Sequence, residues 1–370
     1  MKKEMGTRTG IIYAFLLAVM SGCVDEQRMP EAVQPWPIRL SVVSGDAISS
    51  RAHLYEDIDA MKAEASFGLD AYLEDGSNSL YLDSVWVIHN QGWYFRDREQ
   101  ERLLDYYWPN DHLTNFVAFM PYDLSKSVMK DSEIKFVNDE VTFRCTLPGT
   151  TGNDRIVDDR NEEQRKTEHA IHEFVYACRK DCWKGEGNAD AVKLRFVHPF
   201  AAVKFNLSQS HRNLTIHSIT LSGVHNTGTY ANGKDTYDTY LAGQDALQYD
   251  TWKFDGYTSG KFTLNYEKTV PGDINYYSLI GGPYVVIPQD LSGITLSVSY
   301  TWDKGGGETV SGTTGDVSLV KGGITAWQPG KIYTYTLDMG DNKEEILFRA
   351  TVEEWTKGED EGYENQFEVK

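Results

Sequence analysis

The chain has 370 residues, and its 36 Lys and Arg against 55 Asp and Glu give a formal net charge of −19. Such an acidic surface repels phosphate backbones and anionic lipid headgroups, which excludes nucleic acid as a partner and a basic patch as the means of membrane attachment. The length is well above the usual size of one hydrophobic core, so two domains are expected.

The start of the chain has the features of a secretory signal. Two lysines precede an apolar run over 11–20 that is too short to cross a bilayer as a helix. Two small residues stand directly before Cys23, in a pattern that resembles the lipobox of bacterial lipoproteins. We expect residues 1–22 to be a signal peptide and Cys23 to be lipidated, heading a linker over 23–37. An ordinary cleaved secretory signal is the alternative.

Short runs that alternate aromatic or β-branched residues with polar ones dominate the rest of the chain, which predicts an all-β fold. The predicted strands of the first half lie at residues 38–43, 67–73, 84–88, 115–120 and 134–137. Those of the second half lie at residues 192–196, 202–207, 214–221, 294–302, 332–337 and 345–352.

Polar and glycine-rich segments mark the breaks between these strands. We expect an exposed loop over 152–170, a short helix over 55–64 and a hairpin turn at the three glycines 305–307. The Gly- and Asn-rich segment 184–188 is the expected domain boundary. It separates an N-terminal domain over 38–190 from a C-terminal domain over 191–370.

Three cysteines remain beside Cys23, an odd number, so one of them must stay free. Cys178 and Cys182 could close a small disulfide in an oxidising envelope, or both could remain unpaired thiols. Metal binding is the weakest alternative, because no third and fourth ligand are placed nearby. His169 and His172 do not have the spacing of a zinc protease motif.

Motifs of catalysis and cofactor binding are missing from the sequence. It contains no Gly-x-Ser-x-Gly elbow, no phosphate-binding glycine loop and no dinucleotide fingerprint. We therefore expect a protein that is not an enzyme and that has no catalytic residue, metal or cofactor.

Several segments follow one another in a characteristic order and spacing. They are Ser49–Ala52, Trp108–Pro109, Phe116–Tyr122, Glu173–Ala177, His198–Ala201, Gly228–Tyr230, Val286–Gln289, Trp327–Tyr335 and Val352–Trp355. Together with the lipobox at Cys23, they resemble the fimbrillin family of Bacteroidota, the subunits of type V pili and their accessory proteins. The acidic residues just behind Cys23 likewise resemble the signal that sends lipoproteins of these bacteria to the outer face of the outer membrane.

This resemblance implies a fold of two transthyretin-like β-sandwich domains in tandem and a function in assembly. A lipidated precursor would reach the outer membrane, where an arginine-specific or trypsin-like protease removes its first strand. A strand of another pilus subunit would then fill the exposed groove by donor-strand exchange. By resemblance, Ile38–Val43 is the leaving strand, the bond between Arg51 and Ala52 is the cut site, and residues 345–370 hold the donor.

The tail of the chain carries its own pattern. Residues 363–369 alternate with period two and place Tyr363, Phe367 and Val369 on one face, as an edge-seeking strand would. We predict that this segment acts as part of the donor or pairs loosely with the second domain, and an unstructured terminus is the alternative.

The aromatic content supports a different function. Nine Trp and 22 Tyr are many for this length, and exposed aromatic rings stack on sugars, so a glycan-binding surface lipoprotein is the alternative to a pilus subunit. The tryptophans near predicted turns are Trp108, Trp252, Trp302 and Trp327.

Overall fold

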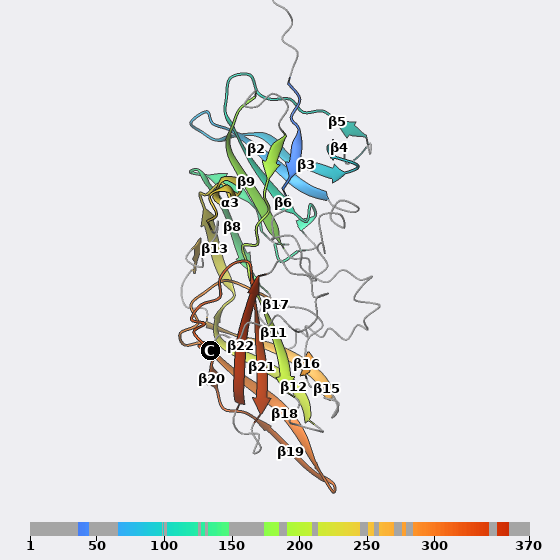
Figure 1. The fold of residues 1–370 in the computed structure, drawn as a ribbon, viewed down its shortest axis with the longest axis vertical. Helices are drawn as coiled ribbons and strands as arrows, with labels where there is room; N and C mark the ends of the chain where they lie inside the picture. Colours follow the sequence, from blue (N-terminus) through green and yellow to red (C-terminus); the bar gives the residue numbers. More distant parts are fainter. Residues whose placement is uncertain are drawn as a thin grey trace, which may run out of the picture. The chain divides into compact units, whose positions relative to one another are not determined.

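The computed structural model describes residues 36–43, 66–97, 99, 102–124, 127–129, 132–147, 174–184, 191–208, 214–244, 251–254, 259–269, 276–278, 284–339 and 346–354. Strands dominate these residues, and the short helix α3 (Thr236–Leu241) lies between two of them (Figure 1). The predicted all-β class is confirmed.

Each strand predicted from the sequence pattern overlaps a strand of the structure. In chain order the strands are β1 (Leu40–Val42), β2 (Ser66–Leu73), β3 (Ser79–His89), β4 (Trp93–Arg96), β5 (Leu103–Leu104), β6 (Thr114–Met120), β7 (Lys135–Val137), β8 (Glu140–Thr146), β9 (Val175–Cys182), β10 (Val192–Leu194), β11 (Ala201–Ser208), β12 (Leu214–His225), β13 (Thr227–Asn232), β14 (Trp252–Lys253), β15 (Ser259–Thr269), β16 (Tyr276–Ser278), β17 (Tyr284–Val286), β18 (Thr295–Gly305), β19 (Glu308–Thr313), β20 (Val317–Ser318), β21 (Lys331–Met339) and β22 (Ile346–Glu354).

A six-stranded sheet in the order β5-β4-β3-β2-β6-β9 organises the first half of the chain, and all its neighbours are antiparallel. Its centre is buried on both faces. All residues of β6 are buried, and only the two end residues of β2 are partly exposed. These strands therefore read as continuous apolar runs rather than as clean alternation, because each face packs against its own hydrophobic cluster.

One face of this sheet packs against a four-stranded sheet in the order β14-β13-β8-β7. Phe143 of β8 lies at the centre of the shared core, with its ring stacked on Tyr230 of β13 at 4.6 Å between centroids. Because β13 pairs with β8, strand pairing crosses the boundary that the sequence predicts at residues 190 and 191. The boundary itself stays a prediction.

Two further sheets form a sandwich in the second half. One has the order β16-β11-β21-β22 with β17 also on β11, and the other has the order β15-β12-β18-β19 with β20 also on β18. Their inward residues form one core, and Trp327 at its centre donates a 2.9 Å hydrogen bond from its indole nitrogen to the Tyr335 hydroxyl. The predicted hairpin joins β18 to β19, and the three glycines of its turn all have positive φ.

No helix within the described residues is long and apolar enough to span a membrane.

Candidate functional site

Segment 36–43 is a separate strand laid over the six-stranded sheet, on the face opposite the four-stranded sheet. Its β1 part runs parallel to β10, with three residues of each strand in register. The Val192 N–H donates to the Arg39 carbonyl at 2.7 Å, and the Val43 N–H donates to the Leu194 carbonyl at 2.9 Å. A main-chain hydrogen bond thus joins the two strands at each end of the paired region.

The beginning of the segment has a second main-chain partner. The Ile38 N–H donates to the Tyr106 carbonyl and the Trp108 N–H donates to the Trp36 carbonyl, each at 2.8 Å. The segment therefore passes from an antiparallel contact at its start to a parallel one at its end. The sequence did not indicate either partner, because neither β10 nor the segment after β5 is near it in the chain.

The side chains of the segment alternate between core and solvent. Ile38, Leu40 and Val42 are 1%, 7% and 8% exposed and join the cluster on this face of the sheet. The other buried members of that cluster come from the sheet, from β10 and from the segment just after β10: Phe67, Leu69, Ala71, Leu82, Val87, Phe95, Phe116, Ala118, Met120, Val175, Ala177, Val192, Leu194 and Phe196. The segment therefore covers an apolar groove. Burial of each of its three aliphatic side chains contributes about 1.5 to 3 kcal/mol to the stability of the folded chain.

Charge contributes little to holding the segment. Arg39 and Asp105 form an ion pair at 3.3 Å, but both side chains are more than half exposed. Exposed pairs of this kind are worth roughly 0 to 1 kcal/mol because water and salt screen them. Apolar burial and main-chain hydrogen bonds therefore dominate.

Helix α3 fixes the strands that border the groove. The Thr236 hydroxyl accepts from the Cys178 N–H of β9 at 3.1 Å and donates to the Arg195 carbonyl just after β10 at 2.7 Å. Asp235 caps the helix and also receives the Arg179 guanidinium at 2.6 Å. These contacts tie β10 to the six-stranded sheet, so the strand that pairs with β1 has a fixed position.

Comparison with protein-family models matches residues 95–355 to a family described as fimbrillin-like. The chain belongs to the fimbrillin-like family. This membership supports a role as a fimbrial subunit at the cell surface. A comparison with curated protein sequences gives no match.

Comparison with solved structures gives a match above a TM-score of 0.5, and that structure shares the fold of this fimbrillin-like chain. A fimbrial protein from Bacteroides vulgatus ATCC 8482 is 18% identical, with a TM-score of 0.55 over 86% of this chain and 99% of that chain. A proposed cell adhesion protein from Bacteroides uniformis ATCC 8492 is 15% identical, with a TM-score of 0.46 over 86% of this chain and 98% of that chain.

The leaving strand predicted at 38–43 lies within the described segment, whereas most of the predicted site residues lie outside the described residues. Those outside are Cys23, Arg51, Ala52, Tyr363, Phe367 and Val369, together with the predicted helix over 55–64, the predicted loop over 152–170 and the histidines His169 and His172. Their predicted roles stay predictions.

The disulfide alternative is corrected by the structure. Cys178 and Cys182 are both free thiols and stand four residues apart on the single strand β9. Four residues of strand span about 13 Å, and a disulfide needs Cα atoms within about 7 Å. Within the described residues, no group of three or more His, Cys, Asp and Glu side chains has the arrangement of a metal site.

The four tryptophans considered for glycan binding lie in different surroundings. Trp327 and Trp252 are 0% and 4% exposed, and both are core residues, so neither can stack on a sugar. Trp108 and Trp302 are half-buried against the hydrophobic clusters. Among the described tryptophans, Trp36 at the start of segment 36–43 is the most exposed, at 47%.

Proposed function

We propose that this chain is a structural or adhesive subunit of a cell-surface type V pilus, assembled by proteolysis-triggered donor-strand exchange. In this proposal Cys23 is lipidated and anchors the precursor in the outer membrane. An arginine-specific or trypsin-like protease cuts between Arg51 and Ala52. Segment 36–43 then leaves, and a strand from another subunit takes its place.

The observation that carries the proposal is the way segment 36–43 is held. It contributes alternate side chains to a core that the six-stranded sheet and β10 otherwise complete, and its main chain pairs with β10 along one edge. A strand of this kind can be replaced by any other extended segment with apolar residues at every second position, because main-chain hydrogen bonds do not depend on sequence.

The energetics of the empty groove favour refilling. Loss of the segment would expose the apolar cluster and the unpaired edge of β10, which is a template for another strand. A donor strand recovers both the burial and the hydrogen bonds. Repeated head-to-tail, this contact gives a filament rather than a closed ring.

The C-terminal part of the chain is the proposed donor region. Its described part, β22, is an edge strand of its sheet and pairs with β21 alone among the described strands. We place the remaining donor residues at Tyr363, Phe367 and Val369, which fall on one face of a strand, as Ile38, Leu40 and Val42 do. The partners are then other pilus subunits, in a homo- or heteropolymer, and the action is assembly rather than catalysis.

Limited trypsin digestion of the purified chain without its first 23 residues tests the proposal. We expect a stable product that begins at Ala52 and forms oligomers in size-exclusion chromatography. An excess of a synthetic peptide of residues 36–43 should prevent oligomer formation, because it occupies the groove.

Matched variants distinguish the effect of cleavage after Arg51 from the effect of changes in the leaving segment 36–43. Arg51→Gln should abolish the product and the oligomers, whereas Arg39→Gln, which changes an outward side chain of the leaving segment, should leave both intact. A chain that is cut after Arg51, loses segment 36–43 and remains a monomer would contradict the proposal.

A further inference from the structure

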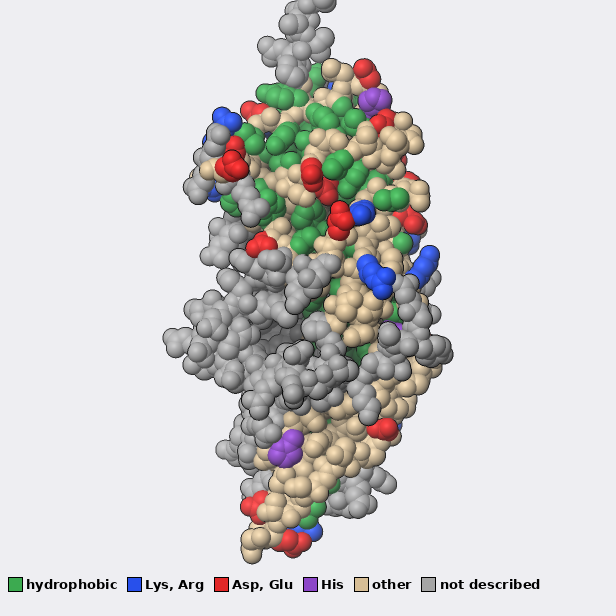
Figure 2. Space-filling view, turned by 180° about the vertical axis from the view of Figure 1, so that it is seen from behind, with side chains coloured by type: hydrophobic (Ala, Val, Ile, Leu, Met, Phe, Trp, Pro, Cys, Tyr) green, Lys and Arg blue, Asp and Glu red, His purple; other side chains and the backbone are tan. Residues whose placement is uncertain are grey.

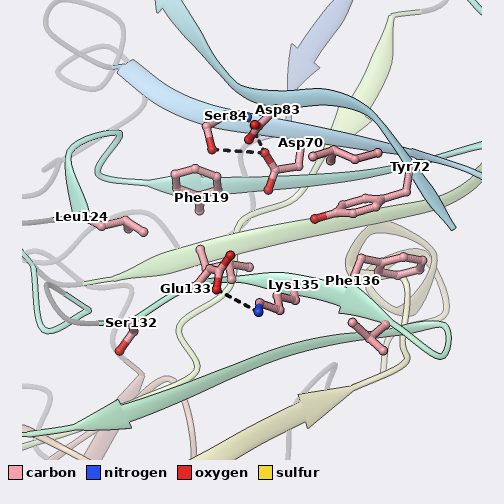
Figure 3. Close-up of a pocket in the computed structure, with 13 residues that line it drawn as sticks. Asp70, Tyr72, Asp83, Ser84, Phe119, Leu124, Ser132, Glu133, Lys135 and Phe136 are labelled. Carbon is pink, nitrogen blue, oxygen red and sulfur yellow. Dashed lines mark hydrogen bonds and ion pairs between the residues drawn. The ribbon is translucent and has the colours of Figure 1, made fainter.

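A cavity of about 350 Å³ lies beside β2, away from the groove of the N-terminal strand. Its walls come from the β2 and β3 strands, from Phe119 and Leu124 at the end of β6 and after it, and from residues 132–137 around β7 (Figure 3). It is thus lined by β2 and β3 of the six-stranded sheet and by β7, the edge strand of the four-stranded sheet. Proposed assembly at the N-terminal strand does not use it.

Asp70 supplies a buried carboxylate to this cavity. The residue is 5% exposed, although it lies in a strand whose neighbours are apolar. A register shift between β2 and β3 at this position brings Ser84 to it, and the Ser84 N–H donates to Asp70 Oδ1 at 2.6 Å. Figure 3 shows the Asp70 carboxylate and the Tyr72 hydroxyl pointing into the same space.

The Asp70 and Asp83 carboxylates of this site have no cationic partner among the residues that the structure describes. Within the described residues, no lysine or arginine forms an ion pair with Asp70 or Asp83. Lys135 is the cation of the cavity wall, and it pairs with Glu133 at 2.8 Å. The described lining of the cavity therefore carries two carboxylates in excess.

Burial raises the pKa of Asp70 from its ordinary value of 3.8 to about 6, and the neighbouring Asp83 charge adds to the effect. Hydrogen bonds from Ser84 and the nearby Tyr72 hydroxyl act in the opposite direction and only partly offset it. The group is therefore ionised at neutral pH at a cost in desolvation. A carboxylate perturbed in this way inside a cavity is a candidate for binding, because a cation would recover that cost.

The remaining walls are aromatic and aliphatic. Tyr72 and Phe136 lie 5.4 Å apart between ring centroids. The other apolar residues of the lining are Leu80, Phe119, Leu124, Ile134 and Val137. Aromatic faces attract cations, most strongly in a partly dehydrated site. A cavity with apolar walls and a carboxylate inside can accommodate a cationic group that is carried on an aliphatic stem.

We propose that this cavity binds an organic ammonium group on an aliphatic stem, of the kind that a lysine side chain carries, with Asp70 and Asp83 as its anionic partners. The excess negative charge disfavours phosphate and carboxylate ligands. The source of the ammonium group is either a small free amine or a lysine side chain of another protein.

Titrations followed by two-dimensional NMR test this site in the whole chain without its first 23 residues. The probes are n-butylammonium, Nα-acetyl-lysine amide and, as the uncharged match, Nα-acetyl-norleucine amide. We expect saturable shifts confined to the cavity residues with the two ammonium probes and none with norleucine amide. Saturation by butylammonium alone would assign the site to free amines, and tighter binding of the lysine amide would assign it to a protein side chain.

Variants and pH locate the binding at the carboxylates. Asp70→Asn should weaken binding about tenfold or more, since it removes a charge-assisted contact. Asp83→Asn, at an exposed position, keeps the test available if Asp70→Asn fails to fold, and Glu308→Gln on β19 is the matched control that should change nothing. Binding should weaken as the pH falls through about 6, where Asp70 gains a proton beside Asp83, Tyr72, Glu133 and Lys135.

Two results would overturn the proposal. One is equal binding of lysine amide and norleucine amide, which would show an apolar site without use of the charge. The other is unchanged ammonium binding in both Asp70→Asn and Asp83→Asn, or an absence of saturation with every probe.

Discussion

Leu40 lies opposite Val192 in a parallel pair of strands, and the two residues are separated in sequence by most of the first half of the chain. The backbone next to this pair is tied by the 2.7 Å hydrogen bond from the Val192 N–H to the Arg39 carbonyl. Main chain fixes the register, and the inward side chains fill the groove. On the face seen in Figure 2, apolar side chains lie interspersed with carboxylates.

Replacing Leu40 with Ala should destabilise the chain by about 2 to 4 kcal/mol, because the side chain is buried and its loss leaves a cavity. Ser41→Ala, at the next and outward position, should change the free energy of unfolding by less than about 0.5 kcal/mol. Urea denaturation followed by tryptophan fluorescence measures both. Equal effects of the two changes would show that the side chains of segment 36–43 do not alternate between core and solvent in solution.

Gly68 provides a second test of the packing around β2. A Cβ at this position would overlap with the ring of Phe119, the residue opposite Gly68 on β6. Gly68→Ala should therefore cost about 1 to 3 kcal/mol or more through overpacking. Gly315→Ala is the control, since an added Cβ meets nothing within 4 Å there.

The double variant Gly68→Ala with Phe119→Leu identifies the cause of that effect. If the ring is the obstacle, its removal relieves the clash and the two changes cost less together than the sum of their separate effects. Strict additivity in thermal or chemical unfolding would mean that another contact causes the loss.

Free thiols are expected at all three described cysteines. Burial raises the pKa of the Cys145 thiol to about 12, and mainly burial raises that of Cys182 to about 12 as well. Iodoacetamide, which reacts with thiolates, should therefore label the native chain slowly and label all three residues after unfolding without a reductant. A disulfide-linked peptide containing Cys178 and Cys182 in the mass spectrum would contradict the structure.

Much of the fold could be predicted because local periodicity directly reflects burial. The apolar run of β6 and the alternation of β18 before its three glycines are examples. Strand β8 is not among the predicted strands, although Val141, Phe143 and Cys145 alternate inward with the same period of two. Helix α3 is too short for a periodic pattern, and its sequence signals are the capping Asp235 and an acidic residue in the first turn.

The candidate site depends on relationships that one strand's sequence does not contain. The pattern of segment 38–43 predicts a strand but not its partner, because parallel pairing with residues 192–194 leaves no local mark. Asp70 is similar. It lies in a run that predicts a buried strand, and only the register shift opposite Ser84 makes a buried carboxylate possible there.

Asp70 should also make stability depend on pH in a defined direction. Its pKa is about 6 in the folded chain and near 3.8 when exposed, so between these values the folded state binds the proton more tightly than the unfolded state. The stability that Asp70 contributes is therefore fully present below about pH 3.8 and is lost as the pH rises through about 6. The total loss is on the order of 2 to 3 kcal/mol.

Urea unfolding of the wild type and Asp70→Asn at several pH values between 4 and 7.5 isolates this contribution, because other groups titrate alike in both proteins. We expect the stability of the wild type relative to the variant to fall as the pH rises. Asp75→Asn is the control without a pH dependence in this range. Hydrogen bonds from Ser79 and Ser77 hold the pKa of the exposed Asp75 below its ordinary value of 3.8, so its contribution is lost only below that pH and should stay constant between pH 4 and 7.5. If the difference between wild type and Asp70→Asn stays constant across this range, Asp70 is not the buried carboxylate that the structure places beside Ser84.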